Sequence, residues 1–300
     1  MAPSESVGAV VGLWRFPVKS MSGERIQQAE LSERGLLGDR GYALVDVATG
    51  KVVSAKSARL FPNVLTCQAR FVEPPHAGRD LPAVRIVLPD ATAVTSDAGD
   101  CDRVLSAYFR REVTLARMAP ENFTIDQYHP DIEGADPAGH RDTVVEAKVG
   151  SAFFAEAGVA SPVPVGAFFD LFPLSVLTTS TLEQVRASRP QSRVDERRFR
   201  MNVIVGTKAP GFVENEWVGR DLAIGDTARV QVRMTDPRCV MTTLAQDELP
   251  SDPEILRALV QHNKLQVGDA GQFPCAGVYA VVTADGTLRI GDPVNLGQAK

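Results

Sequence analysis

Short apolar runs separated by turn-forming residues dominate the first half of this 300-residue chain. Residues 8–16, 25–31, 41–47, 63–71 and 84–89 each have the length and composition of a strand. Glycine, proline, aspartate and serine stand between these runs, and they favour tight turns over a continued strand. The pattern argues against a helical bundle and predicts a meandering, mostly β first half.

Helical patterns are few and lie mainly in the second half. One is predicted over 100–109 behind Asp100 as N-cap, a second over 179–189, and a third over 252–263 with proline in its first turn. Residues 118–168 are rich in Pro, Gly, His and Asp without a sustained period, which predicts a long loop or crossover. The string IGD, at 224–226 and 290–292, suits a hairpin corner and favours a barrel.

Composition limits the classes of partner. Hydrophobic residues make up 44% of the chain and charged residues 23%, which is typical of a globular protein with a sizeable core. The net charge of −5 provides no broad basic field for nucleic acid or anionic lipid, so local cations must hold any anionic ligand. We find no signal-peptide pattern and no membrane span, and we therefore expect a cytoplasmic protein.

The cysteines point to one candidate site. Cys67, Cys101, Cys239 and Cys275 form no CxxC pair, so at most one of them is expected to serve a metal. Cys239 follows an Asp-Pro turn and Arg238 within MTDPRCVMTT. The adjacent cation favours the thiolate, the form that nucleophiles and soft metals require. A small buried core cysteine is the alternative on spacing alone.

Two cationic segments could meet an anion. Lys19 and Ser20 follow the strand RFPVKS, and an ammonium beside a hydroxyl suits a phosphate oxygen. Arg40 stands between two glycines in GDRG, ahead of a strand. The alternative for each is a solvated cation at a strand end.

Two further segments carry hydrogen-bond donors. Arg200 and Asn202 alternate with apolar residues and are expected to share one face of a strand, where they suit a phosphate or the rim of a heterocycle. A solvent-facing strand edge is the alternative. Thr178 and Thr179 either cap the helix that follows them or donate to an anion at its N-terminus.

Other site patterns are missing from the sequence. It contains no GxSxG elbow, P-loop, HExxH or dinucleotide fingerprint. The four histidines, His76, His129, His140 and His262, show no ligand spacing, and solvated imidazoles are expected for most of them.

Six segments, in this order, resemble the two-part MOSC-domain proteins of the amidoxime-reducing type and their bacterial relatives. They are PVKS at 17–20, GDR at 38–40, FPLSVLTTSTL at 172–182, RFRMNVIV at 198–205, RCVMTT at 238–243, and GVYAVVTADGTLRIGDPVNL at 277–296. The resemblance implies a mostly β, α+β chain in which an N-terminal β-barrel-like domain packs against a C-terminal MOSC β-barrel domain. The implied boundaries are 1–125 for the first domain, 126–168 for a connecting region and 169–300 for the MOSC domain.

The resemblance also implies a molybdenum-molybdopterin cofactor with Cys239 as the protein ligand to the metal. By similarity, the cofactor-binding residues are Lys19, Ser20, Arg40, Thr178, Thr179, Arg200, Asn202 and Arg238. Asp170, just ahead of the strand at 171–177, is a candidate active-site acid, although an aspartate there is usually a turn residue.

The activity implied is the reduction of N-hydroxylated small molecules such as amidoximes, hydroxylamines and N-hydroxylated bases. Electrons would come from a separate protein of ferredoxin, flavin reductase or cytochrome type. After the cysteine motif, LAQDELPSDPEILRALVQHN replaces the Asp-Pro-x-Thr-Gly stretch usual in the amidoxime-reducing type, which leaves the substrate open.

Two alternatives remain at this stage. The first is a non-catalytic carrier of sulfur or of the molybdenum cofactor that uses Cys239, without pyridoxal phosphate because no domain for it precedes the first barrel. The second is a plain cysteine nucleophile, although no histidine lies near Cys239 in the sequence.

Overall fold

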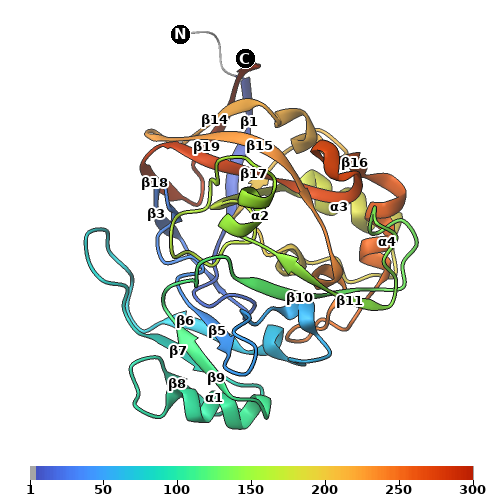
Figure 1. Ribbon diagram of the computed structural model, residues 1–300. Helices are drawn as coiled ribbons and strands as arrows, with labels where there is room; N and C mark the ends of the chain where they lie inside the picture. The colour runs from blue at the N-terminus through green and yellow to red at the C-terminus, as the bar shows by residue number, and fades with distance from the viewer. Residues whose placement is uncertain (1–4, 300) are drawn as a thin grey trace.

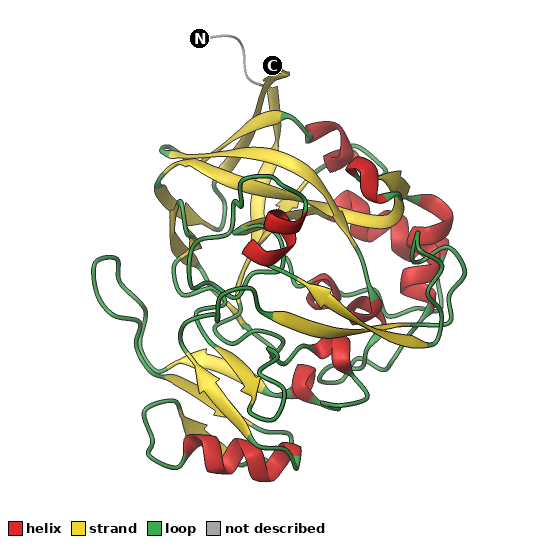
Figure 2. Cartoon of the chain, viewed as in Figure 1, coloured by secondary structure: helices red, strands yellow, loops and turns green. Residues whose placement is uncertain are grey.

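A closed barrel of seven strands forms the centre of the molecule. The computed structural model describes residues 5–299 and is mostly β with a few helices, which confirms that part of the predicted fold class (Figure 2). The barrel strands, in spatial order, are β12 (Leu174–Thr178), β13 (Val203–Gly206), β1 (Glu5–Arg15), β19 (Pro293–Ala299), β14 (Arg220–Ile224), β15 (Ala228–Pro237) and β17 (Gln272–Ala284). β17 also pairs with β12, which closes the ring.

The first strand of the chain belongs to this barrel. β1 lies between β13 and β19 and is antiparallel to both, with Glu5 opposite Leu296. In Figure 1 the blue β1 runs beside the dark red β19, so strands from the two ends of the chain are neighbours. β12 and β13 form the one parallel pair of the ring. The barrel therefore depends on both ends of the sequence.

Alternating side chains fill the barrel. In β15, the fully buried Ala228, Val230 and Val232 alternate with the half-exposed Arg229 and Gln231. Successive side chains of a strand point to opposite faces, so this period of two places one apolar row inside. The same core takes in buried residues of β1, β12, β13, β14, β17 and β19.

The remaining strands form small sheets around the barrel. They are β2 (Glu24–Arg25) beside β1, β16 (Lys264–Gln266) beside β17, the sheet of β18 (Gly286–Arg289), β3 (Gln28–Ser32) and β4 (Gly35–Leu36), the pair β5 (Ala43–Asp46) and β9 (Val113–Ala116), the sheet of β6 (Gln68–Phe71), β7 (Val84–Val87) and β8 (Ala93–Thr95), and the pair β10 (Thr124–His129) and β11 (Thr143–Lys148).

The predicted barrel-like closure of the N-terminal half is therefore wrong for the described residues. Its sheets have two or three strands each and do not join into a ring. The physical reason is that N-terminal strands pair with C-terminal strands and not with one another. β1, the longest N-terminal strand, pairs with β13 and β19, and β3 pairs with β18. The boundaries 1–125, 126–168 and 169–300 stay predictions.

The three predicted helices are present, and a fourth lies in the region predicted to be a loop. They are α1 (Cys101–Phe109), α3 (Thr179–Ser188), α4 (Glu254–His262) and the additional α2 (Ser151–Glu156). Thr178 caps α3, since its hydroxyl accepts a hydrogen bond from the Thr181 amide at 3.2 Å. Within residues 5–299 we find no helix long and apolar enough to span a membrane.

The expectation of an unstructured connection over 118–168 is also corrected. β10 and β11 pair in register from Thr124 opposite Lys148 to His129 opposite Thr143. Ile125 is fully buried and packs with Phe123 and Phe168, so one face of the hairpin contributes to a core. The loop between the two strands is polar and long, and it contains no short hairpin turn that would have predicted their pairing.

Candidate functional site

A cavity lined by charged side chains lies where the end of β15 meets the N-terminal segment. Its polar lining comes from distant parts of the sequence and includes Lys19, Ser20, Arg40, Ser54, Lys56, Asp170, Ser175, Arg200, Asn202, Asp236, Arg238, Cys239 and Tyr279. Eight of the predicted site residues are in this set, namely Lys19, Ser20, Arg40, Asp170, Arg200, Asn202, Arg238 and Cys239.

Cys239 presents its thiol to the cavity at the end of a strand. β15 ends at Pro237, and Cys239 is the N-cap of the short 3-10 helix η5 (Val240–Thr243), where its carbonyl oxygen accepts a hydrogen bond from the Thr242 amide at 3.2 Å. Of the chain's four cysteines it alone is partly exposed, whereas the other three are buried. Burial raises the pKa of Cys67 to about 12, so that thiol stays protonated.

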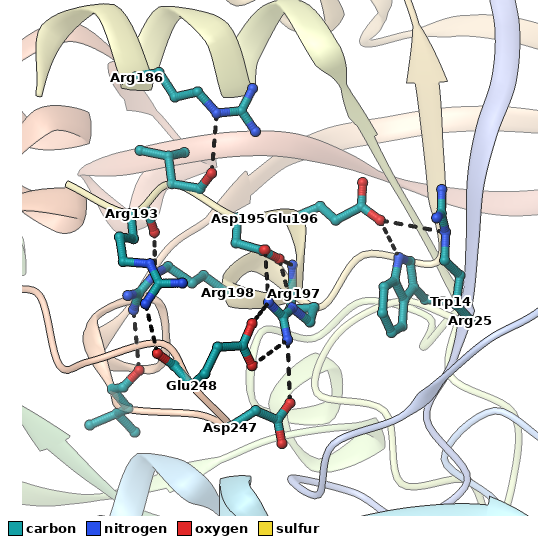
Figure 3. A network of polar contacts seen from close by, with 12 residues as sticks. Trp14, Arg25, Arg186, Arg193, Asp195, Glu196, Arg197, Arg198, Asp247 and Glu248 are labelled. Atoms are coloured by element: carbon teal, nitrogen blue, oxygen red, sulfur yellow. Dashed lines mark hydrogen bonds and ion pairs between the residues drawn. The ribbon is translucent and has the colours of Figure 1, made fainter. Parts of the chain in front are cut away.

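A buried arginine holds the loop that follows Cys239. Arg198, in the 3-10 helix η3 (Glu196–Phe199), is fully buried and donates to the carbonyl oxygens of Leu244 at 3.3 Å and Pro250 at 2.7 Å. Figure 3 shows its neighbour Arg197 reaching Glu248 on the same loop, at 2.6 Å. These contacts fix the polypeptide just beyond the cysteine, because a buried guanidinium requires all its donors to be used.

Asp170 lies between two lysines at the edge of the cavity. Its Oδ1 accepts from Lys19 and its Oδ2 is 2.9 Å from the Lys56 ammonium. Lys19 also donates to the Phe168 carbonyl at 2.7 Å. Although burial opposes the charge, the two lysines hold the pKa of Asp170 well below its ordinary value. The role of Asp170 as an active-site acid stays a prediction, and the contacts place this carboxylate as the partner of two lysines.

Two arginines stack on one aromatic ring beside the cavity. The guanidinium carbons of Arg40 and Arg200 lie 4.9 Å and 4.3 Å from the centre of the Phe16 ring. Arg40 pairs with the buried Asp39, which also accepts from Asn202 Nδ2 at 2.9 Å. Burial and the neighbouring Arg40 charge lower the pKa of Arg200 to about 9. The cluster holds two like charges side by side, a costly arrangement that an anion would relieve.

The predicted strand geometry of Arg200 is wrong. β13 begins at Val203, and Arg200 instead ends η3 with φ of 55° in the left-handed region. Ser20 (φ 69°) and Arg40 (φ 50°) share this uncommon conformation and line the same cavity. Strained non-glycine backbone persists where surrounding structure enforces it, and it is frequent at binding sites.

Arg238 and Asp236 form a buried pair next to Cys239. Arg238 Nη1 donates to Asp236, and Nη2 donates to the Phe199 carbonyl. Arg238 Nε is buried and makes no hydrogen bond within residues 5–299. Burial, opposed by the Arg238 charge and by a hydrogen bond from Tyr279, raises the pKa of Asp236 to about 6. One buried donor beside the cysteine thus has unused hydrogen-bonding capacity.

Thr178 and Thr179 do not line this cavity. The hydroxyl of Thr178, fully buried, donates to Glu214 Oε2 at 2.6 Å, and that of Thr179 donates to the Thr207 carbonyl at 3.4 Å. Of the two readings of this segment, the helix cap is the one that the contacts support. The sequence could not distinguish a helix cap from an anion-binding site, because both use the same threonine hydroxyls.

Several residues escaped the sequence analysis. Lys56 lines the cavity but stands in a segment without a motif. Asp236 and Tyr279 also line it, and they stand in motif segments in which only other residues were assigned a site role. A second cavity of about 240 Å³ shares Lys56, Arg238 and Cys239 with the first and has a largely apolar wall. Its polar end brings together His129 and His140, although the sequence analysis expected solvated histidines without ligand spacing.

Comparison with known families identifies two domains in this chain. Residues 7–98 match the MOSC N-terminal beta barrel domain, and residues 166–295 match the MOSC domain. The chain is therefore a MOSC-domain protein that combines both domains.

Its curated relatives align over nearly the full chain. Mitochondrial amidoxime-reducing component 1 from Homo sapiens is 24% identical over 308 residues, covering 97% of this chain and 84% of the relative. Mitochondrial amidoxime reducing component 2 from Rattus norvegicus is 23% identical over 306 residues, with coverage of 97% and 83%. Among solved structures, the YUAD protein from Bacillus subtilis aligns over 100% of both chains at 11% identity and a TM-score of 0.45.

Proposed function

We propose that this protein binds a molybdenum-molybdopterin cofactor through Cys239 and reduces N-hydroxylated small molecules. The observation that carries the proposal is the composition of the cavity wall. Lys19, Lys56, Arg40, Arg200 and Arg238 line it together with the partly exposed thiol, while the lining carboxylates are Asp170 and Asp236. Fixed positive charge thus exceeds negative charge around a potential thiolate.

This local excess is notable because the whole chain carries a net charge of −5. Concentrating cations in one buried place is unfavourable unless a ligand supplies the opposite charge. A pterin with a phosphate group is such a ligand, and a thiolate suits a metal that prefers sulfur donors. The distant full-length similarity to amidoxime-reducing components supports the same ligand.

A further observation supports the fit between these residues and the molybdenum-molybdopterin cofactor. Among the described residues, Arg238 Nε is a buried donor without an acceptor, and Arg238 directly precedes the proposed metal ligand. Lys56, Arg200 and Arg238 supply ammonium and guanidinium donors suited to phosphate and heterocycle oxygens. When bound, the cofactor would supply a two-electron redox centre for removing an oxygen atom from nitrogen.

The chain's own residues would divide the remaining tasks. The Cys239 thiolate would hold the metal, and Lys19, Lys56 and Arg200 would bind anionic cofactor oxygens. Asp170 would keep both lysines charged and in place, since it contacts each of them. Arg198 would fix the loop behind Cys239 and thereby the direction of the thiol.

The second cavity suits the substrate. Leu171, Met234, Val240 and Phe273 give it an apolar wall, and it reaches Cys239. Its size admits a small aromatic or aliphatic molecule whose N-hydroxyl group points toward the cysteine. Electrons would be supplied by a separate donor protein, and a cytoplasmic location stays a prediction.

The test is a comparison of two cysteine variants of the full chain, produced with molybdenum. Cys239→Ser is expected to keep the circular dichroism spectrum of the folded protein but to lose bound molybdenum and at least about 100-fold of benzamidoxime reduction with an artificial electron donor, because it removes a metal ligand. Cys101→Ser, which changes a thiol outside both cavities, is the matched control and is expected to retain activity.

Unchanged reduction by Cys239→Ser would refute the assignment of this residue. Wild-type protein that holds stoichiometric molybdenum yet reduces no amidoxime, hydroxylamine or N-hydroxylated base would refute the reductase and support a cofactor carrier instead.

A further inference from the structure

Two histidines and an aspartate converge in the loop that joins β10 to β11. His129 is the last residue of β10, and Asp136 and His140 follow it in the loop. Asp136 Oδ2 lies 2.7 Å from His140 Nδ1 and 3.8 Å from His129 Nδ1. One ligand atom from each residue lies within 4.8 Å of the other two. The carboxylate oxygen therefore stands between two imidazole nitrogens.

These separations match the spacing around a small metal ion. A tetrahedral ion with nitrogen and oxygen ligands at about 2.0 to 2.1 Å keeps its ligand atoms about 3.3 Å apart. The two distances to Asp136 Oδ2 bracket that value. Small side-chain adjustments would place all three atoms on one ion, since they already lie within 4.8 Å of one another.

The charge of Asp136 gives a second, independent reason. Its side chain is only 12% exposed, and within residues 5–299 its ion-pair partners are the two histidines, with no lysine or arginine. A mostly buried carboxylate is costly without a nearby cation. A divalent ion would supply the missing positive charge.

The surrounding contacts hold the ligands in place. The His140 backbone amide donates to Asp136 Oδ2 at 3.0 Å, which ties the loop back on itself. Gln127 lies on the other side of the His129 ring, with its amide nitrogen 3.3 Å from Nε2, while Nδ1 faces Asp136.

We propose that His129, Asp136 and His140 bind a divalent first-row transition-metal ion such as zinc. All three residues line the second cavity, the one that reaches Cys239. Three protein ligands leave a fourth position, which would face this cavity and take an oxygen or nitrogen donor from water or a small molecule. The site is separate from the proposed molybdenum ligand and does not depend on it.

The test measures zinc binding to the full chain by calorimetry and the visible spectrum of the cobalt-substituted protein. Wild type is expected to bind one equivalent of zinc and to give a cobalt spectrum typical of nitrogen and oxygen ligands. Asp136→Asn and His140→Ala should each weaken binding at least about tenfold, because each removes a ligand. Cys239→Ser should bind zinc as tightly as wild type.

The matched control is His76→Ala with His262→Ala, which removes two exposed histidines elsewhere and should leave binding unchanged. Equal zinc affinity in wild type and Asp136→Asn would overturn the proposal, as would wild type that binds no zinc. Loss of binding in Cys239→Ser alone would place the ion on the cysteine and overturn it as well.

Discussion

At the scale of single residues, the site depends on Asp170, whose single carboxylate pairs with two lysines. Lys19 is nearly fully buried, Lys56 is 13% exposed and Asp170 is 24% exposed, so water solvates the three charges poorly. Removing one partner from such a group leaves the others buried without compensation. The same triad would set the charge that an anionic ligand meets.

Asp170→Asn is therefore expected to destabilise the cofactor-free protein by about 3 kcal/mol, the usual cost of breaking a buried ion pair. Urea unfolding followed by circular dichroism measures the change. Asp142→Asn, which removes the partner of Arg59 at the exposed surface, is the matched control and should have little effect. Similar unfolding midpoints for both variants would contradict a stabilising role for the triad.

The sequence indicated much of this site but not its geometry. Lys19, Arg40, Arg200 and Cys239 stand in the segments on which the family resemblance was based, and the structure brings them to one cavity. Lys56 could not be found in this way, because its importance arises from contact with Asp170, 114 positions further along the sequence. A pattern of residue types carries no information about such a pairing.

At the scale of elements, local sequence signals predicted the main helices, but they did not predict which distant strands pair. The caps and apolar spacing of α1, α3 and α4 are local, and all three helices are present. The partners of β1 lie about 200 and 290 residues away, at β13 and β19, and no local signal identifies them. His129, at the end of β10, and His140, in the β10–β11 loop, are close in the sequence, but it is the path of the loop and not their spacing that brings them together.

A buried glutamate lies where α3 packs against the barrel. Glu214, in the 3-10 helix η4 (Val213–Trp217), is fully buried and accepts from Thr178, Thr181 and the Gly277 amide. Burial raises the pKa of Glu214 above its ordinary value of 4.5, despite these hydrogen bonds. The folded protein therefore holds this proton more tightly than the unfolded chain.

It follows that the stability contributed by this proton is complete below pH 4.5 and is lost as pH rises through the raised pKa. Glu214→Gln removes the titration, so its unfolding free energy should fall less with pH over that window, by up to about 1.4 kcal/mol per pH unit. Denaturant unfolding across a pH series measures this. The exposed neighbour Glu216→Gln is the control, and parallel curves for wild type and Glu214→Gln would contradict the prediction.

At the scale of the whole molecule, the barrel and the N-terminal sheets differ in how they are closed. The barrel has a continuous ring of paired strands around one core. The sheet of β6, β7 and β8 has one edge joined to Ser22 by a single bridge, packs with α1 and β5 on an apolar cluster separate from the barrel core, and lies at one end of the molecule (Figure 1). Open, short-stranded sheets form fewer cooperative contacts than a closed ring, so we expect this sheet to open first.

Native-state hydrogen exchange of two core variants tests this order. Leu222→Ala in β14 should lower the protection of barrel amides by about 2–5 kcal/mol and leave the β6–β7–β8 amides unchanged, because the barrel stays folded when that sheet opens. Ile86→Ala in β7 should lower the protection of both regions, since opening of the barrel includes prior opening of the sheet. Both residues are fully buried, so the two variants are matched in kind. Equal losses in both regions for Leu222→Ala would mean that the whole chain unfolds as one cooperative unit.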